Sequence, residues 1–362
     1  MVKLRLIRHI SATMRYYPVG YGMGIGVGVI GFGGWAQRHA LFYREAEDAD
    51  LLAISAPSER SRRRAEELFN VDTYADYRDL LAREDIEAVS VVVPNNLHAK
   101  ITIEALRAGK HVLVEKPMAL STADCREMIK AAREENRKLA VGHELRLNPL
   151  MEKIREIIDD GRIGEARACF IDIWRPPWRG GSGGWRYRKE VCGGIIFEEP
   201  VHYIDLFYWY MGMPEEVYAV ANRTSGIFDF EDSLSLSMRH RGGGMSALSF
   251  SMAGFGYDFS IRIAGTEGAI KGTVIGGHYL WSPEAEERRL LFKPKDGEIE
   301  EISLPERIGE LYDLKREIEL WIECIREDKP PIVPGETGMI AVAVCEAAEK
   351  AMSTGKPTRI PL

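Results

Sequence analysis

Two overlapping glycine patterns near the start of the chain have the spacing of a phosphate-binding loop. They are Gly26-Gly28-Gly31 and Gly31-Gly33-Ala36, both of the form G-x-G-x-x-G/A. Such a loop binds a dinucleotide only where it follows a strand and opens a helix, because backbone N–H groups at the helix N-terminus then meet the pyrophosphate. Only the second pattern directly follows a β-branched run, VGVI. We therefore expect the second to be the binding loop, with a purely structural turn as the alternative. Its expected cofactor contacts are Gly31, Phe32, Gly33 and Ala36.

The residues after the second predicted strand, Leu51–Ser55, bear on the choice between NAD and NADP. Chains that prefer NAD place Asp or Glu about 20 residues after the glycines to bind the ribose 2′-hydroxyl. This chain has no acid there; it has Ser55 and Ser58, followed by Arg60 and further arginines. The missing acid and the available guanidinium groups favour a 2′-phosphate, and hence NADP. The alternative is NAD bound through the hydroxyls, with the arginines on a solvated helix face.

Lys116 stands where a doubly wound sheet binds its ligands. It follows the apolar run His111–Glu115 and precedes Pro117, so it leaves a predicted strand at the carboxyl edge of the sheet. Oxidation of a secondary alcohol needs a hydride acceptor over the carbinol carbon and a group that receives the hydroxyl proton. The Lys116 ammonium can hydrogen-bond the reacting oxygen. The alternative is a surface lysine with no catalytic role.

A second group of polar residues lies in a helix predicted over Ile195–Met211. Glu198, His202 and Asp205 are spaced at i, i+4 and i+7, which places them on one helix face. A single helical histidine is more often a packing residue than a catalytic one, so this spacing alone leaves both interpretations of His202 open.

The elements that must position these residues change character near residue 146. From Ile25 to Gly142, strands alternate with helices of about 10–15 residues, the pattern of βαβ units. Right-handed crossovers turn such a parallel sheet into a doubly wound Rossmann fold with helices on both faces. After residue 164 the chain shows short alternating strands between Gly-rich turns, which predict a large, mostly antiparallel open sheet.

We therefore expect an α/β protein with two domains and an N-terminal extension. The first is a Rossmann dinucleotide-binding domain at 23–145. The second is an α+β substrate and oligomerisation domain at 146–362, whose C-terminal helices pack back on the first. Residues 1–22 carry four basic residues and no acidic one, and they lack the apolar core of about 7–15 residues that a signal peptide needs. We interpret them as a tail or an over-long start ahead of Met23, with an Arg-rich transit peptide as the alternative.

The composition argues against several other classes of protein. The chain has 362 residues, of which 45% are hydrophobic and 28% charged, an ordinary balance for a globular protein. The absence of a long apolar run and the net charge of −7 argue against a membrane span and a general nucleic-acid binder. The five cysteines show neither C-x-x-C nor zinc-finger spacing. We therefore expect reduced thiols, no metal site and a cytoplasmic location.

Further motifs are spread over most of the chain. They include PNNLHAKITIEALRAGKHVLVEKP at Pro94–Pro117, GHELRLNP at Gly142–Pro149, GGIIFEEPVHYIDLFYWYMG at Gly193–Gly212, AGTEGAI at Ala264–Ile270 and AAEKAMSTGKP at Ala347–Pro357. The combination of EKP at a strand end with a later G-G…H-x-x-D is specific. With these motifs the sequence resembles the glucose–fructose oxidoreductase / inositol dehydrogenase / MocA (Gfo/Idh/MocA) family over roughly residues 24–362.

The resemblance implies an NAD(P)-dependent oxidoreductase that moves a hydride between nicotinamide and a secondary alcohol or carbonyl of a sugar, polyol or derivative. It also implies that His202 faces the substrate and acts with Lys116 in proton transfer. The implied cofactor contacts are Gly33, Gly34, Trp35, Pro94, Asn95, His98, Glu115 and Lys116. The implied substrate contacts are His143, Arg146, Trp185, Arg186 and Asp205.

Trp185 and Arg186 belong to a segment, Trp174–Glu190, that is rich in tryptophan, arginine and glycine. Tryptophan faces pack on sugar rings, and arginine binds carboxylates or phosphates in a fork. We expect this segment to line the substrate pocket and favour an anionic sugar. The alternative is a surface loop whose tryptophans serve packing.

One stretch departs from the family's pattern. The family has Asp four residues before the histidine and Gly two residues before it, where this chain has Glu198 and Pro200. Glu198 is the expected third catalytic residue. Because proline removes a helix hydrogen bond and clashes with the preceding turn, the helix is expected to start late or kink here. Glu199 is then the alternative inward carboxylate.

Two other functions stay open at this point. The same architecture includes sugar-sensing members that bind the dinucleotide without turning it over, and members that use tightly held NAD transiently in glycoside cleavage. The presence of Lys116 and His202 argues against a sensor, whereas the altered Glu198–Pro200 stretch keeps glycoside cleavage open. The expected partners are a small sugar or polyol and further copies of the chain in a homodimer or homotetramer, with neither nucleic acid nor membrane.

Overall fold

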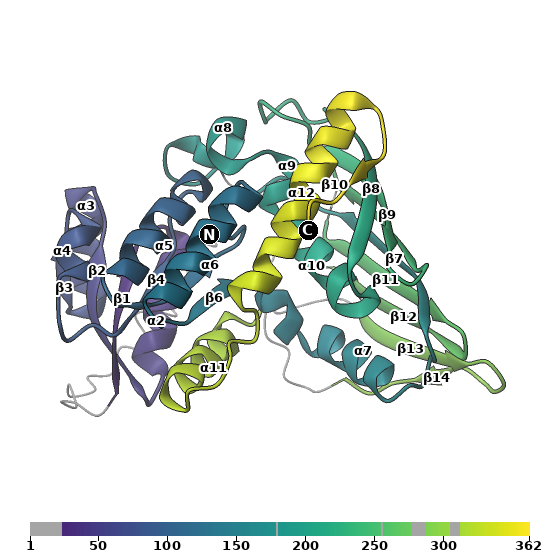
Figure 1. Cartoon of the computed structure of the whole chain (residues 1–362), viewed down its shortest axis with the longest axis horizontal. Coiled ribbons are helices and arrows are strands. Elements are labelled where there is room, and N and C mark those ends of the chain that lie inside the picture. The colour runs from purple at the N-terminus through teal and green to yellow at the C-terminus, as the bar shows by residue number, and fades with distance from the viewer. Residues whose placement is uncertain (1–23, 179, 255, 277–286, 305–311) are drawn as a thin grey trace.

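The structure is a computed structural model that describes residues 24–362 except 179, 255, 277–286 and 305–311. The predicted N-terminal extension, 1–22, lies outside the described residues. Two β-sheets stand on opposite sides of the molecule, with helices on and between them (Figure 1).

The first sheet is parallel throughout and has six strands in the order β3-β2-β1-β4-β5-β6. The strands are β1 (Ile25–Ile30), β2 (Ala49–Ser55), β3 (Asp72–Tyr74), β4 (Ala88–Val91), β5 (His111–Glu115) and β6 (Leu139–Gly142). Every residue of β1, β4 and β6 is buried, as expected for strands that helices cover on both faces. The order is that of a Rossmann sheet, and its switch point lies between β1 and β4.

The helices of this part are α2 (Gly34–Glu45), α3 (Glu59–Phe69), α4 (Tyr77–Leu81), α5 (His98–Arg107) and α6 (Thr122–Glu134). Serine side chains fix two helix starts: Ser58 accepts a hydrogen bond from the Ser61 amide, and Ser121 accepts one from the Asp124 amide. These N-caps satisfy donors that the first helical turn leaves unpaired.

The second sheet has nine strands in the order β14-β13-β12-β11-β7-β10-β9-β8-β15. Its strands are β7 (Ala166–Trp174), β8 (Pro214–Asn222), β9 (Ser233–His240), β10 (Met245–Ser251), β11 (Asp258–Gly265), β12 (Gly268–Ile275), β13 (Glu287–Pro294), β14 (Glu300–Glu301) and β15 (Thr358–Arg359). Only the β7–β10 pair is parallel. In β9, buried Leu234, Leu236 and Met238 alternate with serines on the other face, which is the period of a half-buried strand.

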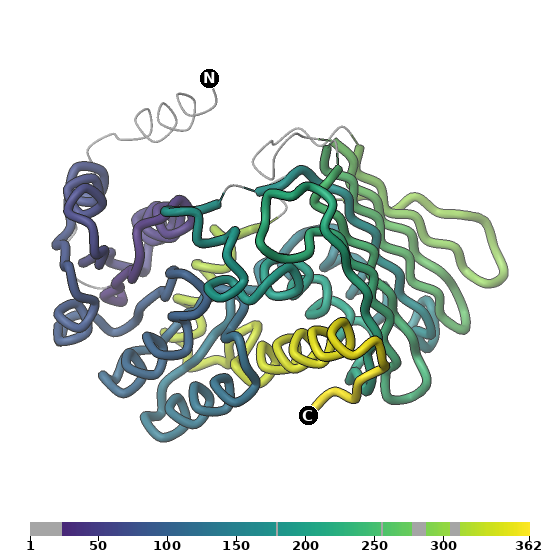
Figure 2. The backbone as a smooth tube through the Cα atoms, turned by 90° about the horizontal axis from the view of Figure 1, so that it is seen from above, coloured from purple at the N-terminus to yellow at the C-terminus, as the bar shows by residue number. Residues whose placement is uncertain are grey.

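Helices join the two sheets. On the second sheet's inner face lie α7 (Pro149–Asp159), α10 (Pro200–Met211) and α12 (Gly335–Thr354), and α12 also packs on α6 (Figure 2). Helix α11 (Leu314–Arg326) packs on α2, where Leu314, Ile318 and Trp321 enter the core beside β1. The C-terminal helices therefore contact the first sheet's layer.

Short helical elements connect these parts. They are η1 (Asn95–Leu97), η2 (Glu144–Leu147), η3 (Ser182–Tyr187), α8 (Lys189–Cys192) and α9 (Ile195–Glu198). The single helix predicted over Ile195–Met211 is wrong, because Glu199 interrupts it with φ −131° between α9 and α10. The kink expected from Pro200 is the physical reason. Elements β3, α4 and β13 were not anticipated from the sequence, and β11 and β12 form a hairpin.

The predicted fold class is confirmed: a parallel Rossmann sheet is followed by an α+β region with a mostly antiparallel open sheet. Among the described helices, none has the length and apolar character to cross a membrane.

Candidate active site

The glycine loop between β1 and α2 has room for a phosphate group. Gly31 has φ +110°, and a Cβ there would lie 2.1 Å from the Val92 carbonyl oxygen, so only glycine fits. Within the described chain, nothing lies within 4 Å of a Cβ placed on Gly33 or Gly34. Gly33 caps α2 without a side-chain hydrogen bond, and the first turn has no acidic residue. The uncapped N–H groups and the open space fit the pyrophosphate of a dinucleotide.

The other loop residues that are predicted to contact the cofactor make contacts with protein side chains in this structure. Ala36 is fully buried, and Phe32 packs edge-on against Phe69 with ring centroids 6.1 Å apart. Both residues therefore have packing roles in this structure. Trp35 is half-buried and donates its indole N–H to Glu115 Oε1 at 2.7 Å.

Glu115 is the last residue of β5, and its buried carboxylate takes part in several hydrogen bonds. His39 Nε2 lies 2.9 Å from the oxygen that Trp35 binds. Burial raises the pKa of Glu115, but the hydrogen bond and charge of His39, the charge of Lys116 and the hydrogen bond from Trp35 together lower it below its usual value. On the neighbouring strand, a Cβ at Gly142 would come 3.2 Å from the same oxygen, so glycine leaves space for the carboxylate.

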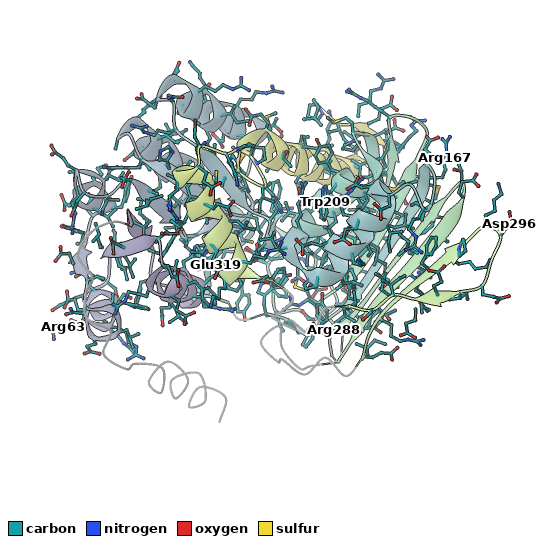
Figure 3. All side chains as sticks on the ribbon, turned by 90° about the horizontal axis from the view of Figure 1, so that it is seen from below. Arg63, Arg167, Trp209, Arg288, Asp296 and Glu319 are labelled. Atoms are coloured by element: carbon teal, nitrogen blue, oxygen red, sulfur yellow. The ribbon has the colours of Figure 1, made fainter. Side chains whose placement is uncertain are left out.

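The expected binding site for the adenosine ribose of the cofactor lies at the start of α3. Figure 3 labels Arg63 of this helix at the outer edge of the molecule. Ser58 Oγ is already engaged with the amide and the hydroxyl of Ser61, at 3.1 and 3.0 Å. Arg62 donates to the carbonyls of Ala56 and Pro57 at 2.9 and 2.8 Å. Ser55 is buried at the end of β2. Arg60 is exposed and makes no hydrogen bond or ion pair with any described residue.

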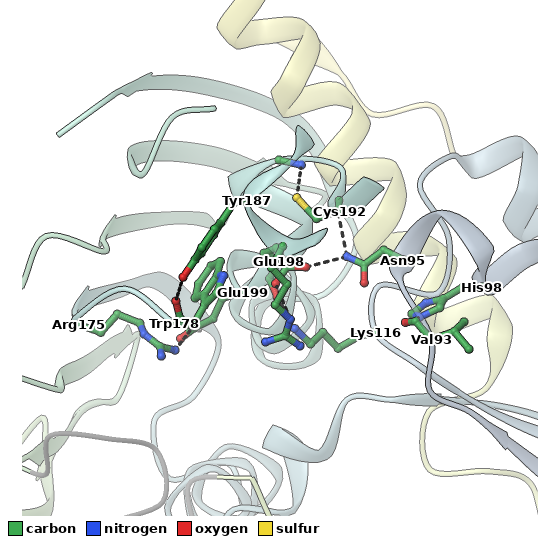
Figure 4. A network of polar contacts seen from close by, with 12 residues as sticks. Val93, Asn95, His98, Lys116, Arg175, Trp178, Tyr187, Cys192, Glu198 and Glu199 are labelled. Carbon is green, nitrogen blue, oxygen red and sulfur yellow. Dashed lines mark hydrogen bonds and ion pairs between the residues drawn. The ribbon is translucent and has the colours of Figure 1, made fainter. Parts of the chain in front are cut away.

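Lys116 lies at a junction between the two parts of the chain (Figure 4). Its Nζ donates to the main-chain carbonyl oxygen of Glu198. The Glu198 carboxylate accepts a hydrogen bond from Asn95 Nδ2 at 2.9 Å and lies 3.6 Å from Arg186 Nε. Asn95 also donates to the Cys192 carbonyl at 2.8 Å. The structure thus brings Lys116, Asn95, Glu198 and Arg186 together from four separate elements.

His98 holds the backbone on both sides of this junction. Its Nδ1 lies 2.7 Å from the Pro117 carbonyl oxygen and its Nε2 lies 3.0 Å from the Val93 carbonyl oxygen. Burial lowers the pKa of His98, and the two carbonyl oxygens act against this shift by favouring the protonated ring. The contacts fix the turn after Lys116 against the end of β4, next to Pro94.

His202 lies in the first turn of α10, between two other rings. His143 meets it edge-on with ring centroids 5.6 Å apart, and Tyr312 lies over it at 5.0 Å and a tilt of 36°. Burial, Lys116 and His143 lower the pKa of His202 well below its usual value. Its Nδ1 makes no hydrogen bond within the described chain. The lowered pKa keeps the imidazole neutral at pH 7, and its Nδ1 is available to hydrogen-bond a ligand.

Arg146 and Asp205, both predicted substrate contacts, bind each other. Arg146 Nε and a terminal nitrogen donate to the two Asp205 oxygens at 2.6 and 2.7 Å, and the guanidinium lies 5.2 Å from the Trp209 ring centroid. Both residues are buried. In this structure the pair links the 3-10 turn after β6 to α10.

The three tryptophans of the Trp174–Glu190 segment differ in position. Trp174 is 48% exposed on the open face of the second sheet, whereas Trp178 is buried against Phe228. Trp185 is half-buried, with the Arg186 guanidinium 5.1 Å from its ring centroid. Of these tryptophans, Trp185 is the one placed beside the Glu198–Lys116 junction, through Arg186.

The structure adds residues that the sequence analysis did not anticipate. Tyr312 contacts both His202 and Trp35, with the Trp35 ring centroid 6.3 Å away. Glu199, the alternative inward carboxylate, forms a buried ion pair with Arg175 and accepts a hydrogen bond from Tyr203 at 3.0 Å. No local motif marks Tyr312 or Arg175, because their roles depend on contacts between distant segments.

Comparisons with known proteins agree with this geometry. Residues 25–143 match the model described as "Oxidoreductase family, NAD-binding Rossmann fold", and residues 151–271 match "GFO/IDH/MocA C-terminal domain". A 2,7-anhydro-N-acetylneuraminate hydratase from Mediterraneibacter gnavus is 32% identical over 68% of this chain and 67% of its own. Myo-inositol 2-dehydrogenase from Thermotoga maritima is 28% identical over 92% of this chain and 98% of its own.

Solved structures show the same fold. The WlbA dehydrogenase from Bordetella pertussis, in complex with NADH and UDP-GlcNAcA, superposes with a TM-score of 0.81 at 24% identity. The match covers 94% of this chain and all of the other. This chain belongs to the Gfo/Idh/MocA oxidoreductase family. The predicted family and the predicted class of enzyme, an NAD(P)-dependent oxidoreductase, are confirmed.

Proposed function

We propose that the enzyme transfers a hydride between a nicotinamide dinucleotide and a secondary alcohol or carbonyl carbon of a sugar, polyol or sugar derivative, with Lys116 and His202 handling the proton. The observation that carries the proposal is that Lys116, which follows β5, binds the Glu198 carbonyl just before α10, close enough to His202 of that helix for its charge to lower the histidine pKa. The relative named myo-inositol 2-dehydrogenase supports a polyhydroxylated substrate.

The chain's own residues divide the work as follows. The glycine loop and the uncapped start of α2 hold the dinucleotide, which supplies the hydride acceptor or donor when bound. Lys116 Nζ donates a hydrogen bond to the reacting oxygen and orients it. His202, kept neutral by burial and by the charge of Lys116, takes the hydroxyl proton during oxidation and returns it during reduction. Trp185 and Arg186 bind the part of the substrate away from the reacting carbon.

The experiment is a cofactor-absorbance assay of wild type and Lys116→Ala over a panel of sugars, polyols and sugar acids that includes myo-inositol. We expect Lys116→Ala to lower turnover by about 100-fold or more, as for removal of a hydrogen-bond donor to the reacting oxygen. Dinucleotide affinity, measured by fluorescence titration, should change by less than about threefold, since the proposed contact of Lys116 is with the reacting oxygen of the substrate. Near-normal turnover of the variant would remove Lys116 from the proposed role.

The same assay addresses a second kind of chemistry. One relative is named as a hydratase, and the Glu198–Pro200 stretch departs from the family's pattern. Product formation is therefore followed by chromatography alongside cofactor absorbance. Product without any net change in cofactor would favour hydration or cleavage over net oxidation.

We propose NADP(H) as the preferred cofactor. Two features support it: no acid stands at the end of β2, and Arg60 is exposed without a partner among the described residues. The Kd of NADPH is expected to be about tenfold below that of NADH, the size of one charge-assisted phosphate contact. A clear preference for NADH contradicts this choice.

We also propose that the Rossmann domain ends near residue 145 and that the enzyme is a cytoplasmic homo-oligomer. All five cysteines are free and buried, which suits a reducing compartment. The open face of the second sheet exposes Phe170, Trp174, Tyr218, Val220 and Met245, a surface suited to a second copy. Light scattering after size-exclusion chromatography should give a dimer or tetramer mass, and a monomer mass at high concentration would exclude this assembly.

A further inference from the structure

The polypeptide between α9 and α10 breaks at the residue next to the proposed site. α9 ends at Glu198, Glu199 has φ −131° and ψ −43°, and Pro200 is the first residue of α10. Proline suits the first position of a helix, because its fixed φ is helical and its missing N–H is not needed there. It also disfavours the helical conformation of the preceding residue, which here is Glu199.

The break leaves two carbonyl groups of α9 without their helical donors. Ile196 would accept from residue 200, but Pro200 has no N–H, and the Cys345 thiol donates to the Ile196 oxygen instead at 3.6 Å. Glu198 would accept from the His202 amide, but this amide donates to Glu199 at 3.0 Å. The Glu198 oxygen is therefore available, and Lys116 Nζ binds it.

A buried ion pair holds the break in place. The Glu199 side chain turns to Arg175 and Tyr203, on the side of α10 that faces the second sheet. The Glu198 side chain turns to Asn95 and Arg186. The two adjacent carboxylates thus diverge, and the hydrogen bond that Lys116 makes to this segment goes to a neutral main-chain oxygen (Figure 4).

We propose that Pro200 is a positioning residue for the reaction: it frees the Glu198 carbonyl to hold Lys116 and keeps the lysine out of an ion pair with the Glu198 carboxylate. This inference rests on the proposed function of Lys116. A lysine paired with a carboxylate stays protonated to higher pH, whereas a neutral acceptor positions it without that bias. The proline therefore sets where Lys116 lies and which oxygen it binds.

Several other charged or titratable groups surround Lys116 and act on it in any variant. They are Glu115 on its own strand, His98 on α5, His143 and Glu144 after β6, and His202 on α10. None of these groups is substituted in the experiment, and the double variant isolates the contribution of the Glu198 carboxylate.

The experiment measures the titration of Lys116 without any substrate. Wild type, Pro200→Ala and the double variant Pro200→Ala/Glu198→Gln are labelled with trace acetic anhydride across a pH series. Mass spectrometry of the peptide that contains Lys116 then gives the midpoint of labelling. Without the proline, Glu199 is free to become helical, and the His202 amide is then expected to donate to the Glu198 carbonyl in Pro200→Ala. Lys116 loses that acceptor and pairs with the Glu198 carboxylate instead. The midpoint of labelling therefore rises by about one pH unit.

The double variant lacks that carboxylate, so its labelling midpoint should lie within about 0.3 pH units of the wild-type midpoint. A difference of that size is too small for a full ion pair. If Pro200→Ala does not fold, Pro200→Gly restores the same N–H and should shift the midpoint in the same direction. An unchanged midpoint in the folded single variant overturns the proposal, as does a rise that persists in the double variant. Because labelling needs no turnover, its failure leaves the assay of Lys116→Ala as a separate test of function.

Discussion

The glycine loop after β1 and the helix break before α10 both present main-chain polar groups to the proposed site, but they depend on different scales of structure. In the loop, Gly31 and its neighbours leave N–H groups of α2 uncapped within a few consecutive residues. At the break, the Glu198 carbonyl becomes useful only because Lys116, 82 positions earlier, reaches it. The comparison shows that neighbouring residues alone form the cofactor loop, whereas the position of Lys116 depends on packing between distant segments.

The largest expected effect comes from a substitution in the glycine loop. Gly31→Ala should destabilise the protein by about 3 kcal/mol or more, because its backbone conformation strains an L-residue and its Cβ would clash with the Val92 carbonyl. Chemical denaturation checks the stability. Gly33→Ala is the matched control: its Cβ meets open space among the described residues, so it should keep its stability and lose dinucleotide affinity. Equal stability of Gly31→Ala and Gly33→Ala would contradict the claim that the backbone at Gly31 requires glycine.

An effect of comparable size comes from breaking a contact between distant segments near α10. Arg146→Met leaves the buried Asp205 carboxylate without its partner and should cost about 3–5 kcal/mol in the free energy of unfolding. Denaturation of Arg146→Met/Asp205→Leu should show that most of this loss is recovered, since a matched apolar pair leaves no buried charge. An active double variant would remove both residues from the predicted substrate contacts, and an inactive but stable one would support them.

The smallest effect concerns a buried carboxyl on α11. Burial, followed by the charges of Glu144 and Glu115, raises the pKa of Glu317 well above its usual value, and its Oε2 has no hydrogen-bond partner among the described residues. Because the folded pKa exceeds the unfolded one, this group's contribution is fully present below about pH 4.3 and is lost as pH rises through the folded pKa.

Glu317→Gln should therefore raise the free energy of unfolding by about 1–2 kcal/mol at pH 8 and change it little near pH 4. Thermal melts at the two pH values measure the difference. The exposed Glu319, labelled in Figure 3, supplies the control: Glu319→Gln should show no such pH dependence. A uniform change at both pH values would mean that packing, rather than charge, accounts for the result.

Much of the fold was predictable because its signals are local. The bounds of β1, β5, β6 and α3 follow from apolar runs, glycine patterns and helix caps, and the structure reproduces them. The short β3 and α4 escaped notice because three to five residues carry too little periodicity. The hairpin of β11 and β12 is hard to recognise from sequence because its two-residue turn lies inside an apolar pattern.

The sequence by itself determined the Rossmann order of elements, the glycine loop and the position of Lys116 at a strand end, since each depends on neighbouring residues and on rules of chain connection. Only the tertiary structure decided what those groups meet. It joined Arg146 to Asp205, placed Tyr312 over His202 and turned Glu198 and Glu199 in opposite directions. Such contacts depend on how distant segments pack, and a periodicity of three or four residues carries no information about partners tens or hundreds of positions away.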